Sequence, residues 1–98
     1  MERHYELTHN AAAKRYEFNI EGEKAFIEYL EKPGVVVLTH TRVPESLGGR
    51  GIGSELVLST LEAIRDRKLQ VVPMCSFVAQ YIRRHPQWEQ IVFQGREQ

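Results

Sequence analysis

Residues 48–53 read Gly-Gly-Arg-Gly-Ile-Gly, so four glycines stand within six positions. An apolar run at residues 35–41 precedes this glycine loop, and a segment with helical periodicity follows from Ile52. Glycine lets the backbone approach a ligand closely, and a helix that starts here directs its unpaired amides and the positive end of its dipole at the same point. This combination favours the binding of a phosphate or diphosphate group.

Three segments before the glycine loop have the pattern of β-strands. Residues 15–20 alternate polar and apolar side chains, which predicts a strand with one buried face. Residues 21–24 read as a tight turn and residues 25–31 continue in extended form, so the two strands form a hairpin. After a second turn at residues 32–34, the β-branched and apolar run 35–41 predicts a central strand covered on both faces. These segments predict a three-stranded meander.

The periodicity changes after the glycine loop. Apolar side chains recur at helical spacing, at Ile52, Leu56, Leu61 and Ile64. This spacing predicts a helix that ends at Lys68, and the apolar segment 69–74 then predicts another strand. A strand, a helix and a strand in succession imply a parallel pair joined by a right-handed crossover.

A second helix is predicted near the end of the chain. Ser76 is suited to cap a helix at residues 77–84. This helix should stop at His85 because the residue before a proline, here Pro86, disfavours the helical conformation. Residues 87–93 predict a short turn and a last strand.

Together the elements predict an α+β fold: a mixed, mainly antiparallel sheet with one parallel pair joined by a crossover helix, plus a second C-terminal helix. A chain of 98 residues has room for one domain, residues 1–98. Any site must therefore be built from this one sheet and its helices.

Charge and composition argue against several classes of partner. The 13 lysines and arginines balance 13 aspartates and glutamates without a basic cluster, so we expect no nucleic-acid binding. The apolar runs are too short to cross a bilayer and residues 1–6 lack the apolar core of a secretory signal, so we expect a cytoplasmic protein without a membrane partner. One cysteine and four scattered histidines lack metal-ligand spacing, so we expect no metal.

Other phosphate-binding loops fit the glycine loop less well. A P-loop has a glycine, four residues and then Gly-Lys-Ser/Thr; Gly48 and Gly53 have that spacing, but Ser54 follows directly and the lysine is missing. A dinucleotide-binding fingerprint has Gly-x-Gly-x-x-Gly directly after a strand and an acidic residue about twenty positions later. The spacing from Gly49 is instead Gly-x-Gly-x-Gly, and no carboxylate lies near Val71. A plain turn with a close helix contact is the remaining alternative.

The region around the glycine loop resembles the acetyl-CoA signature of the GNAT acetyltransferase superfamily. Residues 38–44, Leu-Thr-His-Thr-Arg-Val-Pro, precede a loop similar to the signature Gln/Arg-x-x-Gly-x-Gly/Ala, and a helix follows. Gly51 and Gly53 match the two small positions, and Gly48 stands where the family has glutamine or arginine. This last departure removes a side chain but keeps the main-chain donors.

A second motif resembles a narrower group within that superfamily. Residues 72–78, Val-Pro-Met-Cys-Ser-Phe-Val, followed by residues 85–88, His-Pro-Gln-Trp, are similar to the compact, single-domain GNAT-like proteins with a cysteine at the end of the fifth strand. The resemblance covers nearly the whole chain, and the two motifs together are more specific than either alone.

The resemblance implies a three-layer α/β arrangement in which residues 35–41 and 69–74 are the fourth and fifth strands. These strands would splay apart at their ends, with the pantetheine arm of acetyl-CoA between them and the diphosphate on the glycine loop. The acetyl group would then lie near Cys75. The cofactor-binding residues implied in this way are Thr41, Arg42, Val43, Gly48, Gly49, Arg50, Gly51, Ile52, Gly53, Ser54, Tyr81 and Arg84.

Cys75 and His40 are the candidate catalytic residues. Cys75 lies between a predicted strand and a helix start, where amide dipoles favour the thiolate and lower the pKa of a thiol, as in an activated nucleophile. His40 precedes the loop on the neighbouring strand, where its imidazole could approach the acyl carbon or Cys75 and remove a proton from an amine or thiol. The structural alternatives are a small residue that seals the sheet end and a hydrogen-bonded histidine on a sheet face.

Tyr81 and Arg84 lie on the second predicted helix. The resemblance implies that Tyr81 could protonate the departing CoA thiolate, although its spacing with Val78 and Ile82 favours a place in the core. Arg84, with Arg83 beside it, could reach the 3′-phosphate of CoA or remain a solvated surface arginine.

The function implied is an N-acetyltransferase that moves an acetyl group from acetyl-CoA to a primary amine, directly or through an acyl-Cys75 intermediate. Non-catalytic CoA-binding or interaction modules and a plain α+β scaffold are the alternatives. The chain omits N-terminal helices that longer members place over the acceptor, so we expect an open cleft suited to a protein or another large amine. An uncovered strand edge at residues 15–20 suggests a monomer or a weak dimer.

Overall fold

The structure, a computed structural model, describes residues 4–94. Five strands form one sheet in the order β1–β2–β3–β4–β5, with antiparallel neighbours throughout except for the parallel pair β4–β5. The strands are β1 Thr8–Asn10, β2 Arg15–Ile20, β3 Glu23–Lys32, β4 Val35–Arg42 and β5 Gln70–Pro73. The mixed, mainly antiparallel sheet with one parallel pair confirms the predicted fold class.

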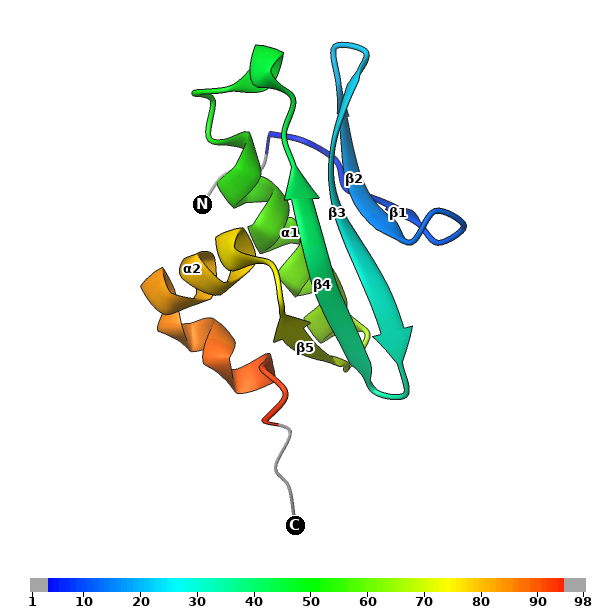
Figure 1. Ribbon diagram of the computed structural model, residues 1–98, viewed down its shortest axis with the longest axis vertical. Helices are drawn as coiled ribbons and strands as arrows, with labels where there is room; N and C mark the ends of the chain where they lie inside the picture. The colour runs from blue at the N-terminus through cyan, green and yellow to red at the C-terminus, as the bar shows by residue number, and fades with distance from the viewer. Residues whose placement is uncertain (1–3, 95–98) are drawn as a thin grey trace.

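Within residues 4–94, two α-helices and two short 3₁₀ helices complete the fold. Helix α1, Ile52–Asp66, connects β4 to β5, and helix α2, Ser76–Arg84, follows β5 (Figure 1). The 3₁₀ helices are η1, Glu45–Leu47, in the loop after β4, and η2, Pro86–Ile91, after α2. Beyond η2, Val92 forms a parallel bridge to Val71, so the predicted turn is present and the predicted last strand is reduced to one bridge.

The core lies between α1 and one face of the sheet. The four apolar positions that predicted α1 are each at most 1% exposed, which confirms the helical periodicity. They pack with sheet residues that are also buried, including Tyr16, Phe18, Ile27 and Leu38. Burial of such apolar side chains supplies the main favourable term in folding.

The β2–β3 turn is tighter than the sequence predicted. Only Glu21 and Gly22 connect the strands, and both have positive φ angles, 54° and 81°. Glu23 and Lys24 pair with Ile20 and with Asn19, so the predicted four-residue turn was wrong. Two-residue turns with left-handed residues match the twist of a hairpin, and this is why the shorter turn forms.

Strand β1 was not predicted. Its three residues pair with residues 15–17 of β2 and cover part of the edge that we expected to be open. Three residues are too few to show an alternating pattern. The register of β1 is fixed by its pairing with β2 and not by a pattern of its own.

Strand β4 contains a β-bulge that reorients its end. Leu38 pairs with Tyr29 and His40 pairs with Glu28, so Thr39 is the extra residue. Side chains paired across two strands lie on the same face.

Because of this extra residue, Thr41, opposite the buried Ile27, lies on the helix-facing side, whereas His40 lies with Glu28 on the outer face. The outer face is incompletely covered, since Val35 and Val37 are partly exposed, so the prediction of a strand covered on both faces was wrong.

Candidate functional site

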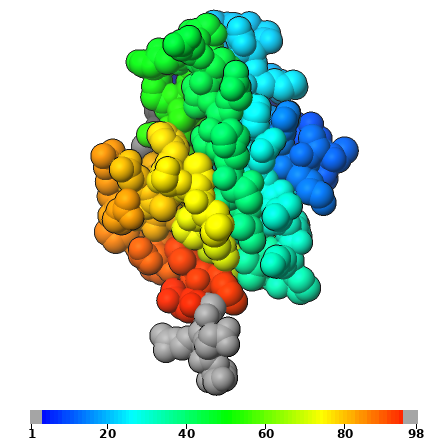
Figure 2. All heavy atoms as spheres, viewed as in Figure 1, coloured from blue at the N-terminus to red at the C-terminus, as the bar shows by residue number. Residues whose placement is uncertain are grey.

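Strands β4 and β5 remain paired over four residues and then separate. Residues 35–38 pair with residues 70–73, and the last contact is a hydrogen bond of 3.0 Å from Cys75 N to Leu38 O. Beyond it, β4 continues to Arg42 paired only with β3, while the chain after β5 turns into α2. The expected splay of the parallel pair is therefore confirmed. On the face seen in Figure 2, β4 and the β5–α2 junction lie at the surface.

The glycine loop leads directly into α1. Gly49 and Gly51 have φ angles of 78° and 71°, a conformation that other L-residues adopt at a cost. Gly51 is the N-cap residue and no side chain caps the helix, so the amides of the first turn are left to other acceptors. This is the geometry expected for binding a diphosphate.

The N-termini of α1 and α2 lie close together. A Cβ atom added at Gly53 would lie 2.8 Å from Cζ of Phe77, a residue in the first turn of α2, and 3.6 Å from Cγ2 of Val43. A side chain at position 53 would therefore displace the ring of Phe77, and Gly53 leaves room for that ring. Two positive helix ends meet near the end of β4, and their dipoles both favour negative charge there.

Cys75 lies at this junction as the N-cap residue of α2, so the prediction that Ser76 caps the helix was wrong. Its Sγ lies 3.2 Å from the Thr41 hydroxyl, across the gap between the separated strands. Partial burial alone would raise the pKa of the Cys75 thiol. Hydrogen bonds from the Thr41 hydroxyl and from the amides of Val78, Phe77 and Thr41 outweigh burial, so the pKa lies below its ordinary value. This environment favours the nucleophilic thiolate.

The structure brings Thr41 rather than His40 to Cys75. His40 is exposed and lies opposite Glu28 on the outer face of the sheet, because the bulge at Thr39 shifts the alternation of β4. The sequence alone could not reveal this, since strict alternation without a bulge would place His40 on the same face as Leu38.

Three of the predicted cofactor-binding residues line one small pocket. Ser54, Tyr81 and Arg84 surround a cavity of about 60 Å³ between the first turn of α1 and helix α2. Tyr81 is 7% exposed and stacks on His85 with ring centroids 4.1 Å apart. Burial, and secondarily the charge of Glu62, raise the pKa of Tyr81, which keeps its hydroxyl protonated.

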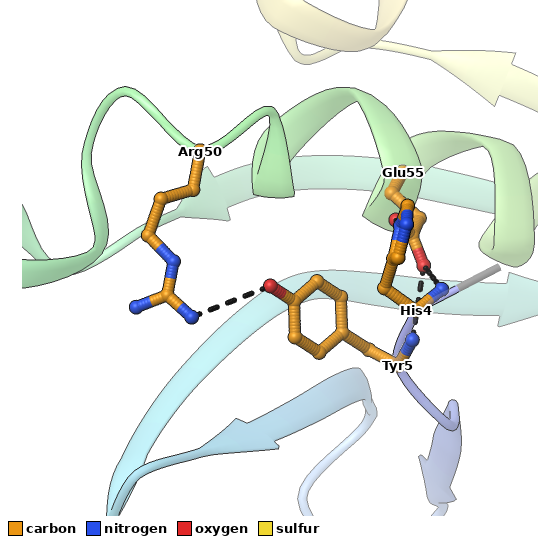
Figure 3. Close-up of polar contacts among 4 residues, drawn as sticks. All are labelled: His4, Tyr5, Arg50 and Glu55. Atoms are coloured by element: carbon orange, nitrogen blue, oxygen red, sulfur yellow. Dashed lines mark hydrogen bonds and ion pairs between the residues drawn. The ribbon is translucent and has the colours of Figure 1, made fainter. Parts of the chain in front are cut away.

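The side chain of Arg50 points to the β2–β3 turn and the N-terminal segment (Figure 3). Nη1 and Nη2 lie 3.2 and 3.3 Å from the two carboxylate oxygens of Glu21, and Nη2 lies 3.4 Å from the Tyr5 hydroxyl. Hydrogen bonding to Glu21, and then to Tyr5, raises the pKa of the guanidinium.

Glu55, in the first turn of α1, secures the N-terminal segment. Its carboxylate accepts hydrogen bonds from the amides of His4 and Tyr5, at 2.6 and 3.0 Å (Figure 3). Sequence reasoning did not identify Tyr5, Glu21 or Glu55. The one available signal was a glutamate beside Gly22 in a tight turn, where asparagine or glycine is the usual choice.

Within residues 4–94, histidine, cysteine and acidic side chains form no group of three or more that could hold a metal ion. In the same range, no helix combines the length and the apolar character needed to traverse a bilayer.

Known structures contain a similar fold. A GCN5-like candidate N-acetyltransferase from Staphylococcus aureus, solved in solution by NMR, superposes with a TM-score of 0.69 over 95% of this chain and 91% of that one. The two sequences are 22% identical, so this likeness concerns the fold.

Curated proteins are similar in sequence. Protein NATD1 of Gallus gallus is 26% identical over 85 residues, which cover 83% of this chain and 76% of that protein. Protein NATD1 of Homo sapiens is 32% identical over 59 residues, which cover 60% of this chain and 51% of that protein. The sequence profile described as GCN5-related N-acetyl-transferase matches residues 15–91, most of the chain and both halves of the site. The chain therefore belongs to the GCN5-related N-acetyltransferase family.

Proposed function

We propose that this protein transfers an acetyl group from acetyl-CoA to a primary amine, with Cys75 as the nucleophile. The observation that carries the proposal is the position of Cys75. Its thiol lies at the N-terminus of α2, where β4 and β5 separate, in contact with the Thr41 hydroxyl and with a lowered pKa. A partly buried thiol stabilised as the thiolate is suited to attack a thioester.

The cofactor would follow the path expected from the family. Thr41 and Arg42, on the part of β4 that β5 leaves free, and Val43, which follows the strand, are suited to hold the pantetheine arm. The amides of residues 49–54 are suited to the diphosphate because Gly51 leaves the first turn of α1 uncapped, whereas the Gly48 amide already donates to Glu45 O. The pocket formed by Ser54, Tyr81 and Arg84 lies next to that turn, and Arg84 is suited to bind the 3′-phosphate of the cofactor.

The reaction would proceed in two steps. In the first, the Cys75 thiolate attacks the carbonyl carbon of the thioester, the bond from Sγ to carbon forms, the bond from carbon to the CoA sulfur breaks, and CoA leaves as a thiolate that takes up a proton. In the second, a neutral amine attacks the acetyl-cysteine, loses a proton and releases Cys75 as the thiolate. Main-chain amides near Thr41 and Phe77 would stabilise the negative charge that develops at the carbonyl oxygen.

Direct attack by the amine on acetyl-CoA is the competing route, and His40 is the residue suited to accept its proton. His40 lies on the outer face of β4, beyond the last β4–β5 pair, so an amine that enters from that face would meet it. The two routes differ in what Cys75 does, which makes them separable by experiment.

Mass spectrometry after incubation with acetyl-CoA alone tests the proposal. We expect Cys75 to gain one acetyl group, which an added amine then removes. A Cys75→Ala variant should lose turnover, whereas His40→Gln should retain most of it. Full turnover by Cys75→Ala with a large loss in His40→Gln would replace the covalent route by the direct one.

Calorimetry separates catalysis from binding alone. We expect CoA and acetyl-CoA to bind the wild-type protein, and a Gly51→Val variant to lose that binding because the left-handed residue tolerates no β-branched side chain. Binding without turnover over a broad panel of amines would make the protein a CoA-binding module. A failure to bind either ligand would overturn both interpretations.

A further inference from the structure

Glu21 occupies a position that its own residue type disfavours. Its φ angle is 54°, in the left-handed region that an ordinary L-residue adopts only at a cost. Asparagine and glycine take this position in hairpin turns more easily. When a residue type is disfavoured by its backbone conformation, we expect a contact elsewhere in the fold to compensate for that cost.

That contact is the guanidinium of Arg50, at the centre of the glycine loop. Glu21 binds it through both carboxylate oxygens, and Tyr5 adds a third contact at 3.4 Å. Tyr5 is itself fixed, because its amide donates to the buried Glu55 and its ring lies 5.4 Å from that of Phe18. Two separate parts of the chain therefore hold one side chain of the loop.

Arg50 stands between the two residues that give the loop its freedom. Gly49 and Gly51 are both left-handed, and a Cβ atom at either would meet no neighbour within 4 Å, so side-chain packing does not restrain them. The side chain of Arg50, between these two glycines, restrains the loop instead. Its two partners, Glu21 and Tyr5, both lie outside the loop.

We propose that Glu21 and Tyr5 are positioning residues that hold Arg50 and thereby fix the glycine loop in the conformation that presents its amides to a diphosphate. The side chain of Arg50 then acts as an anchor pointing away from the ligand, and the loop amides make the contact. This inference deepens the proposed function and rests on it for the identity of the ligand. Fixing a loop before binding increases affinity because less conformational freedom is lost on binding.

The substitution Glu21→Asn tests the anchor because it removes the carboxylate and favours the turn. Lys14→Asn is its matched control: Lys14 is also left-handed, with a φ angle of 57°, and lies in the β1–β2 turn. Both variants should be at least as stable as the wild-type protein in thermal unfolding. If Glu21 served only to form its turn, the amide exchange of the glycine loop would be unchanged in both variants.

Amide hydrogen exchange of the ligand-free protein provides the first measurement. We expect exchange at residues 49–53 to be about two- to fivefold faster in Glu21→Asn than in Lys14→Asn, in proportion to the modest strength of an exposed ion pair. The interior of α1 should exchange equally in both. Equal exchange at the loop would overturn the inference whether or not the protein binds CoA.

Titration with CoA provides the second measurement. Glu21→Asn should weaken binding by about two- to fivefold, Arg50→Gln should weaken it to the same extent, and the double variant no further, because each loses the same anchor. Stronger binding by Glu21→Asn would mean that Arg50, once released, binds the phosphates directly, and would overturn the inference. If wild-type CoA binding is absent but the exchange result holds, the proposed function fails and the anchoring of the loop stands.

Discussion

The lowered pKa of the Cys75 thiol depends in part on a residue 34 positions earlier in the chain. Thr41 reaches the thiol only because the bulge at Thr39 turns it toward the helix-facing side of β4. A sequence motif can therefore identify the cysteine, but the partner that adjusts its acidity depends on one extra residue in a strand.

Thr41→Val should raise the pKa of Cys75, because valine has nearly the same shape but donates no hydrogen bond to the thiolate. The rate of alkylation by iodoacetamide, followed against pH, should have its inflection at a higher pH than in the wild-type protein. Thr39→Val is the matched control, since the Thr39 hydroxyl donates to Glu28 O. An unchanged inflection in Thr41→Val would assign the lowered pKa to the main-chain amides alone.

The elements themselves were predicted with uneven success. Strands β2, β3, β4 and β5 and helices α1 and α2 were identified because alternation and helical spacing are properties of consecutive residues. Strand β1, the bulge in β4 and the cap of α2 were missed, because each is fixed by a partner distant in the sequence. The same distinction applies to the candidate site: the glycine loop and Cys75 stand out in the sequence and stay predictions as site residues, whereas the contact between Cys75 and Thr41 depends on the fold.

Glu55 connects two elements, the N-terminal segment and α1, and its loss should destabilise both. Burial alone would raise the pKa of its carboxyl, but hydrogen bonds from the amides of His4 and Tyr5 and from the His4 ring lower it overall. A carboxyl with a lowered pKa contributes stability that is present above its unfolded pKa and lost as the pH falls through its folded pKa.

Glu55→Gln should therefore lower the free energy of unfolding by about 1–2 kcal/mol near neutral pH, the contribution of hydrogen bonds to a charged group. The difference in the free energy of unfolding between the variant and the wild-type protein should narrow in acid, where Glu55 of the wild-type protein is protonated and also uncharged. Urea unfolding at neutral and acidic pH measures both effects. Glu45→Gln, at an exposed position in η1, serves as the control and should change stability by less than about 0.5 kcal/mol.

At the scale of the whole molecule, α1 is held at both ends, by the N-terminal segment at its start and by the sheet at its end. Glu55 holds the first turn, and just past the last turn Arg67 donates to the Tyr16 hydroxyl at 3.0 Å and to Glu31 at 2.9 Å. His9 of β1 joins the second attachment, because its ring stacks on Tyr16 at 4.4 Å. The sheet edge, the central strands and the helix end thus share one polar aromatic cluster.

This cluster makes the stability of the molecule depend on pH through His9. Burial, and then the charge of Arg67, lower the pKa of His9, whose Nε2 lies 2.6 Å from the Tyr29 hydroxyl. The neutral ring therefore contributes stability that is present above its unfolded pKa of about 6.5 and is lost as the pH falls through the folded pKa. Unfolding measured at pH 7 and pH 5 should show a smaller loss of stability in His9→Gln than in the wild-type protein, and equal losses would assign the pH dependence to other groups.

Trp88, the single tryptophan of the chain, follows α2 in η2 and is 6% exposed. The guanidinium carbon of Arg65 lies 5.3 Å from the centre of its ring, and together they border the groove between α1 and α2. Trp88 is therefore an intrinsic fluorophore beside the groove between α1 and α2. An indole shielded from water emits at shorter wavelength than a hydrated one. The emission maximum of Trp88 therefore reports whether α2, with the Cys75 thiol at its start, remains packed against the rest of the protein.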